Sequence, residues 1–277
     1  NRQDWRRDNI NLFIQRSHES VRAVKPWVKF GVSPFGIWRN QNSDPSGSAT
    51  NGLQSYSDIY ADSRKWIQQA WVDYLTPQLY WSVGFSVANY GVLLPWWGAL
   101  GGSRHIYSGM AAYKVNNGGT DNNWSQPTQI PNQVRLNRQQ AHVRGQTFFS
   151  ARSVLGNPLG VRDALRDDLF RTPALLPPMP WKDDQPPPPV GNLTAQTRGN
   201  EVRLSWVAPP ATGNALDKVR QFVVYRSTGS TINRDEAANI VRITANESET
   251  SFTDPGLAAG TYYYTVTALD RLHNESI

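Results

Sequence analysis

Hydrophobic positions in the first 170 or so residues alternate between helical spacing and short, continuous apolar runs. Helical spacing predicts a helix over residues 8–24, and its apolar side chains are Ile10, Phe13, Ile14, Val21 and Val24. The apolar run at residues 27–33 (WVKFGVS) follows a proline that ends this helix, and it predicts a buried strand. The chain therefore begins with a helix followed by a strand.

The same alternation continues along the chain. Asp62 or Ser63 can cap a helix within residues 60–71, and a buried strand follows at residues 72–81 (VDYLTPQLYW). Further helices are predicted at residues 93–100, 132–145 and 161–170, and the second of these is predicted to end at Gly145. Further strands are predicted at residues 104–115 and 146–156. Buried strands separated by amphipathic helices are typical of a parallel α/β sheet. Because a complete eight-unit barrel takes about 250 residues, these units correspond to half of one.

A proline-rich stretch and a change of pattern mark a second domain. Prolines are dense around residues 181–189, which we interpret as a stiff linker between a first domain at residues 1–180 and a second at residues 190–277. Short strands with alternating polar and apolar positions then follow, separated by turn residues. This pattern predicts an antiparallel β-sandwich.

Composition excludes several classes of partner and cofactor. The net charge is +6, but Lys and Arg are scattered among Asp and Glu, so we expect no nucleic-acid partner. With no cysteine and four dispersed histidines, we expect no disulfide, no zinc site and no cofactor. The uncharged residues 81–102 have the length of a membrane span, but Asn89, Pro95 and several glycines predict a loop and a short helix instead. No signal peptide is visible, and the polar start looks like an interior cut.

Several motifs resemble known families. WRRDNIN, VKFGVSPFGIWRN, YADSRKWIQQAWVDYLTPQLYW and GMAAYKV resemble the carboxyl half of glycosyl-hydrolase-like family 10 proteins. The pattern from residue 186 to the end resembles a fibronectin type III module, with Trp206 as its core tryptophan. The first resemblance implies a (β/α)8 TIM barrel in a bacterial cell-envelope protein, periplasmic, extracellular or lipid-anchored through its amino terminus. It also implies cleavage of a peptidoglycan-type glycan, and a missing amino-terminal half of the barrel as a partner, with acidic residues at its fourth strand end.

Candidate site residues lie at the predicted strand ends and in the adjoining loops. The strand ends SPFG, QLYW, AAYK and FFSA contain no carboxylate, although glycoside hydrolysis normally needs two carboxyl groups. We predict Asp58, in a loop between tyrosines, and Tyr80 as catalytic residues. Asp62 is interpreted as a helix cap, and Asp73 as a structural residue before its strand. Aromatic rings and polar groups suit sugar binding, and the predicted binding residues are Phe35, Trp38, Tyr60, Gln78, Trp81, Tyr113, Lys114 and Arg7.

Three functions remain open at this stage. The first is a glycoside hydrolase of which this chain contains part of the active site. The second is a non-catalytic glycan-binding or scaffold protein that uses the same strand ends. The third is recognition of another protein by the fibronectin-like module. A fold alone does not separate these possibilities.

Overall fold

The computed structural model describes residues 1–277, which form two compact units, Asn1–Arg171 and Thr172–Ile277. We predicted that the first domain would extend to residue 180. Within the second unit, the Met179 N–H donates to the Leu272 carbonyl. The Asn274 side chain likewise donates to the Asp183 carbonyl. Each unit is described by itself below.

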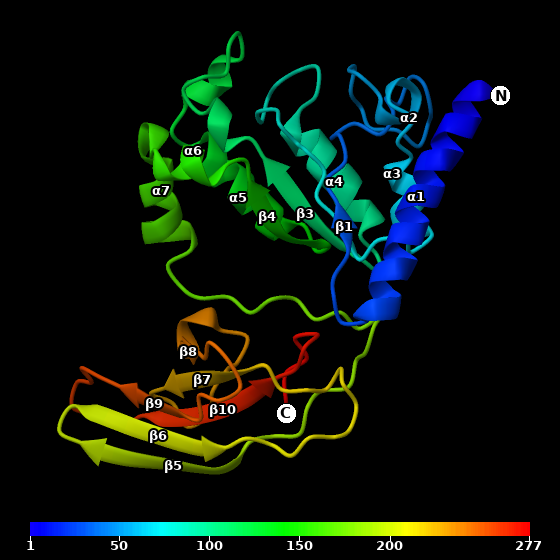
Figure 1. The fold of residues 1–277 in the computed structure, drawn as a ribbon. Coiled ribbons are helices and arrows are strands. Elements are labelled where there is room, and N and C mark those ends of the chain that lie inside the picture. The colour runs from blue at the N-terminus through cyan, green and yellow to red at the C-terminus, as the bar shows by residue number, and fades with distance from the viewer. The chain divides into compact units, whose positions relative to one another are not determined.

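The first unit is built on a parallel sheet, drawn at the top of Figure 1. Its strands are β1 (Gly31–Val32), β2 (Tyr74–Leu75), β3 (His105–Met110) and β4 (Val143–Phe148), and they lie side by side in chain order. Every neighbouring pair is parallel. The predicted parallel α/β region is therefore confirmed.

Helices connect the strands of this unit and cover its sheet. They are α1 (Arg2–Val24), α2 (Ser55–Asp58), α3 (Ser63–Gln68), α4 (Tyr90–Leu100), α5 (Gln129–Gln139), α6 (Ala151–Leu155) and α7 (Val161–Ala164). Short 3₁₀ turns η1 (Ala112–Lys114), η2 (Asn122–Ser125) and η3 (Pro158–Gly160), and a π-helical turn η4 (Leu165–Leu169), complete the unit. No helix in the structure combines the length and apolar character that a membrane crossing needs.

One face of the sheet forms the core. Leu75, Ile106 and Met110 are completely buried, and they belong to one apolar cluster with Trp97 of α4 and Val134 of α5. Full burial of a side chain of this size stabilises the fold by roughly 1.5–3 kcal/mol. Because successive residues of a strand point to opposite faces, the alternate positions are left for the other face of the sheet.

Two sequence predictions around the fourth strand are wrong. The helix predicted to end at Gly145 ends at Gln139, and Gly145 lies within β4. There it has a φ of +156° beside a shift of register with β3, and an added Cβ would lie 3.2 Å from the Tyr107 ring. The glycine thus serves a β-bulge rather than a helix end. The strand predicted over residues 146–156 also ends early, because α6 begins at Ala151.

The second unit consists of two antiparallel sheets, as predicted. Strands β5 (Gly191–Arg198), β6 (Glu201–Val207) and β9 (Ser251–Asp254) form one sheet, in the order β5-β6-β9. Strands β7 (Gln221–Ser227), β8 (Ile240–Ile243) and β10 (Tyr263–Leu269) form the other, in the order β10-β7-β8. The buried Trp206 packs edge-on against Phe222, with 5.6 Å between ring centroids. The short 3₁₀ turn η5 (Ala237–Asn239) precedes β8.

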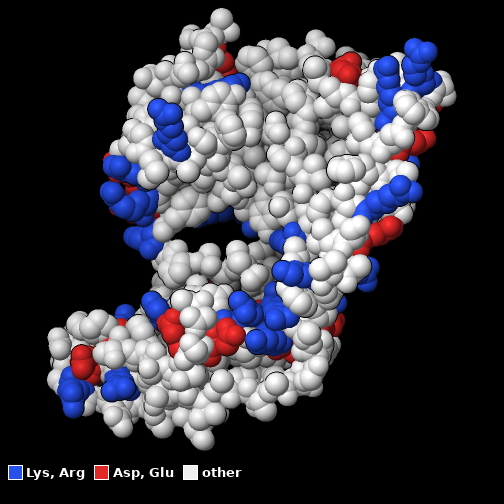
Figure 2. All heavy atoms as spheres, in the orientation of Figure 1, with Lys and Arg blue, Asp and Glu red and all other residues white.

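Charged side chains are interspersed on the surface. Figure 2 shows basic and acidic side chains next to one another on the visible face, with broad uncharged areas between them.

Candidate functional site

The backbone brings the ends of three parallel strands together. Bridges join Phe35 to Gln78 and Gln78 to Gly109, beyond the ends of β1 and β2 and within β3. Glycines permit this close approach, since a Cβ on Gly36 would lie 2.4 Å from the Gln78 carbonyl oxygen. A Cβ on Gly109 would lie 2.7 Å from the Pro77 carbonyl oxygen. We call this region, which continues to residues 80, 113 and 149, the strand-end surface.

Aromatic rings line the strand-end surface. Phe35 packs edge-on against Trp81, with 5.6 Å between ring centroids. Tyr80, Tyr113 and Phe149 form a cluster in which the ring centroids are 5.8–6.1 Å apart. Tyr113 and Phe149 are 41% and 57% exposed. These rings can offer apolar faces to a ligand.

Polar groups lie among the rings. The Gln78 amide donates to the Ser33 carbonyl at 3.2 Å, and the Lys114 ammonium donates to the Tyr80 carbonyl at 2.7 Å. Burial lowers the pKa of Lys114, and the nearby Asp121 carboxylate opposes that change. Burial raises the pKa of Tyr80, and the Tyr113 phenol raises it further. Tyr80 therefore keeps its proton at neutral pH and can donate a hydrogen bond.

The loop between β1 and β2 holds a separate group of predicted site residues. Asp58, which we predicted to lie in a loop, is the last residue of α2, and its exposed carboxylate accepts a hydrogen bond from the Gln54 N–H at 2.7 Å. The Tyr60 hydroxyl accepts one from Arg6 at 2.6 Å, and the Arg6 guanidinium also lies 4.9 Å from the Tyr60 ring centroid. Asp62 caps α3, as predicted, and accepts a hydrogen bond from the Trp38 indole at 2.9 Å. These contacts fix the loop locally.

Trp38 and Arg7 lie inside a stack that supports this loop. Trp38 is 5% exposed, because Trp96 stacks on its ring at 6.1 Å and the Arg64 guanidinium lies 5.0 Å from the ring centroid. Arg7 is also buried, pairs with the Asp4 carboxylate and lies 4.1 Å from the Tyr56 ring centroid. Because packing covers both side chains, we leave them out of the strand-end surface, and their role in binding a glycan stays a prediction.

A family model matches the segment that contains most of this surface. Residues 1–126 match the model described as Glycosyl hydrolase-like 10. Over these residues the chain is similar to the Glycosyl hydrolase-like 10 family. These residues include β1, β2 and β3 and every predicted site residue.

Two curated relatives are also glycosyl hydrolases by name. The Glycosyl hydrolase YngK of Bacillus subtilis (strain 168) is 40% identical over 278 residues, which cover 99% of this chain and 53% of YngK. The Glycosyl hydrolase DigH of Escherichia coli (strain K12) is 44% identical over 114 residues, which cover 40% of this chain and 26% of DigH. The chain is thus homologous to glycosyl hydrolases and spans about half the length of YngK.

A comparison with solved structures finds a weaker similarity for the remainder. The central fibronectin-III array of RIM-binding protein matches with a TM-score of 0.26 and 16% identity, covering 32% of this chain and 31% of that chain. We base no argument on a similarity of this size. The fibronectin-like architecture of the second unit rests on its own strand pairing.

Two residues that the sequence analysis missed lie at or near the strand-end surface. Asp121 falls within the Glycosyl hydrolase-like 10 segment, and its carboxylate accepts a hydrogen bond from the Ser82 hydroxyl at 2.7 Å while acting electrostatically on Lys114. Phe149 lies beyond that segment, in the FFSA strand end, which contains an aromatic pair but no carboxylate.

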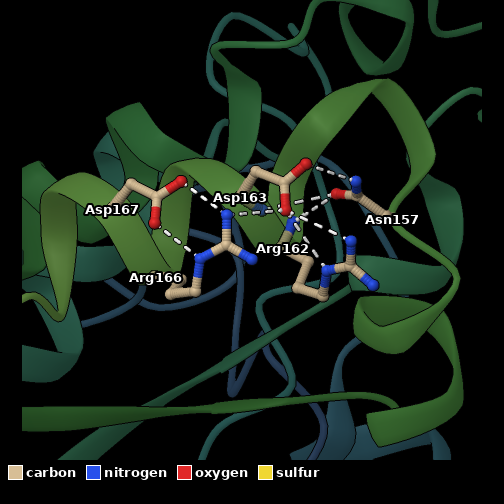
Figure 3. Close-up of polar contacts among 5 residues, drawn as sticks. All are labelled: Asn157, Arg162, Asp163, Arg166 and Asp167. Carbon is tan, nitrogen blue, oxygen red and sulfur yellow. Dashed lines mark hydrogen bonds and ion pairs between the residues drawn. The ribbon is translucent and has the colours of Figure 1, made fainter.

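Other carboxylates of the first unit have structural partners. Asp73 lies just before β2, at the amino-terminal edge of the sheet, and accepts a hydrogen bond from the Phe30 N–H at 2.8 Å. Figure 3 shows Asp163 held by Asn157 and Arg162, with hydrogen bonds that lower the pKa of its carboxyl group. Asp167 pairs with Arg166 in the same network.

Proposed function

We propose that the chain is part of a glycoside hydrolase that cleaves a bacterial cell-envelope glycan of the peptidoglycan type. The observation that carries this proposal is the strand-end surface, where Gln78, Tyr80, Tyr113 and Lys114 converge among aromatic rings at the carboxyl ends of parallel strands. Aromatic faces suit the C–H faces of sugars, and amide, phenol and ammonium groups suit their hydroxyls. Active sites of parallel α/β barrels lie at this edge.

The role of this chain in the reaction depends on which of the catalytic carboxyl groups it supplies. Hydrolysis of a glycosidic bond normally requires two carboxyl groups on opposite sides of the bond. The strand ends of this chain contain none, so we propose that at least one carboxylate comes from an amino-terminal half of the barrel. Within this chain, the exposed Asp58 is the candidate carboxylate, and the protonated Tyr80 is positioned to donate a hydrogen bond to the substrate or to a carboxylate.

Substitutions in the full-length protein test this proposal. We expect Tyr80→Phe to lower kcat for release of reducing ends from peptide-free glycan strands about tenfold, because one hydrogen bond is lost. We expect Asp58→Asn to lower it about a hundredfold if the carboxylate takes part in proton transfer. Asp8→Asn, which changes an exposed aspartate on α1, is the matched control and should leave kcat unchanged. Normal turnover by folded Tyr80→Phe and Asp58→Asn proteins would refute the site.

A second candidate is a protein that binds the glycan without cleaving it. The absence of Asp and Glu from the four strand ends favours it. Binding of glycan oligomers to the full-length protein, measured by calorimetry, together with no release of reducing ends would support this function over hydrolysis.

The proposed substrate also gives a proposed location. A hydrolase of envelope glycan acts outside the cytoplasm, so we propose a periplasmic, extracellular or envelope-anchored protein. Cell fractionation of the full-length protein would test this, and recovery in the cytoplasmic fraction alone would contradict it.

A further inference from the structure

The exposed ring of Phe149 is held rigidly at the end of β4. Its backbone N–H donates to the Met110 carbonyl at 2.9 Å, and its carbonyl accepts from the Tyr113 N–H at 3.1 Å. The backbone is therefore fixed on both sides, while 57% of the residue is exposed. An exposed apolar ring on a fixed backbone is ready to bind, because little conformational freedom is lost when a ligand contacts it.

The neighbouring residue already makes the core contact at this position. Phe148 is partly buried, packs against the core of the first unit and lies edge-on to Phe170, at 6.5 Å. Since successive strand residues point to opposite faces, Phe149 is directed toward Tyr80 and Tyr113 instead. Packing of the core therefore does not explain Phe149.

The rings are distributed across all four strands. Phe35 follows β1, Tyr80 follows β2, Tyr113 follows β3 and Phe149 follows β4. Strands β1 and β4 are separated by three spacings of about 4.8 Å, so the edge formed by the strand ends is wide enough for a chain of sugars. A glycan that contacts both ends must lie across the strands rather than along them.

We infer that Tyr113 and Phe149 form a sugar-stacking subsite beside Tyr80, in which Phe149 binds a sugar adjacent to the one that Tyr80 contacts. This inference rests on the proposed function, and it specifies a polymeric substrate that runs from the Phe35–Trp81 pair to Phe149. The Tyr113 and Tyr80 hydroxyls supply polar contacts next to the apolar face of Phe149. Phe149 is a binding residue here and takes no part in proton transfer.

The test compares glycan oligomers of different length in the full-length protein. Loss of one stacked ring should weaken binding roughly three- to tenfold. We therefore expect Phe149→Ala to raise KM by this factor for long oligomers, with kcat and the KM of the shortest cleaved oligomer unchanged. Phe149→Trp, which keeps an aromatic face, should restore the KM. Phe170→Ala, which removes another partly exposed phenylalanine, is the matched control and should behave like the wild type.

A direct binding measurement separates this inference from the proposed function. If no oligomer is cleaved but calorimetry shows that Phe149→Ala weakens binding of long oligomers, the proposed hydrolase function is refuted and the proposed subsite is supported. If oligomers are cleaved and Phe149→Ala changes no KM, the subsite fails and hydrolysis stands. An equal loss for all lengths, together with a lower unfolding midpoint, would show a structural role and overturn the subsite. Absence of glycan binding to the wild type overturns both.

Discussion

At the residue scale, the position of the strand-end surface depends on glycines that let backbones approach. Gly36 lies in the loop after β1, where its carbonyl accepts a hydrogen bond from the Trp97 indole at 2.8 Å. A Cβ there would lie 2.4 Å from the Gln78 carbonyl oxygen and 2.7 Å from the Trp81 ring. The first of these atoms belongs to the backbone, so a methyl group requires the strand ends to separate. The glycine therefore fixes the distance between Phe35 and Gln78.

The close approach at Gly36 predicts opposite effects on stability for alanine substitutions at Gly36 and Gly98. Gly36→Ala should lower the free energy of unfolding by about 1–3 kcal/mol, the usual cost of overpacking. Gly98→Ala is the control, because its Cβ would make only ordinary contacts at 3.6 Å or more and alanine favours a helix such as α4 by up to about 1 kcal/mol. Urea unfolding of both variants measures the difference. Equal stability of the two variants would contradict the assigned role of Gly36.

At the element scale, hydrophobic periodicity predicted the strands and their parallel arrangement but not the elements around β4. The strand runs VKFGVS and VDYLTPQLYW are apolar because helices cover one face of the sheet. These strands can therefore be recognised from the sequence by their apolar residues. A glycine at a β-bulge and a glycine at a helix end look alike in a sequence, so Gly145 was misassigned. The role of Phe149 depends on Tyr80 and Tyr113, which only the folded sheet brings near it.

The amino-terminal edge of the sheet contains a partly buried lysine, from which a dependence of stability on pH is predicted. Lys29 precedes β1, and its ammonium contacts the His105 ring and the Tyr107 hydroxyl of β3. Burial lowers the pKa of Lys29 from 10.5 to about 8, and the Asp73 carboxylate opposes this change. At pH values between about 8 and 10.5, Lys29 is protonated in the unfolded chain but largely deprotonated in the folded chain. The unfolded chain therefore binds more protons, and the free energy of unfolding rises with pH.

Lys29→Met should remove this rise. We expect the free energy of unfolding of the wild type to increase from pH 8 to pH 10, and that of the variant to stay flat over the same interval. Above pH 10 the trend reverses, because burial raises the pKa of Tyr107 from 10.0 to about 12 and its phenol must stay protonated in the folded state. Denaturant unfolding at several pH values measures both effects. A rise that persists in Lys29→Met would show that another group is responsible.

At the scale of the whole molecule, the first unit presents surfaces that its own residues do not cover. Its sheet has β1 and β4 as unpaired edges. Helix α1 exposes Trp5, Phe13 and Val24, and a shallow groove on the same helix is lined by Leu12, Phe13, Arg16 and Val21. Open sheet edges and exposed apolar patches favour association. These surfaces fit the proposal that an amino-terminal half of a barrel packs against this unit.

The last prediction concerns association of the chain. Expressed alone, residues 1–277 should be poorly soluble or self-associate, and co-expression with the amino-terminal half should give a stable one-to-one complex. Phe13→Ser should weaken that complex, because it removes an exposed ring from the groove on α1. Val207→Ser, which changes an exposed apolar residue of the second unit, is the matched control. Size-exclusion chromatography with light scattering measures the molar mass of the complex for both variants. If residues 1–277 form a soluble monomer that does not bind the amino-terminal half, the proposed barrel is refuted.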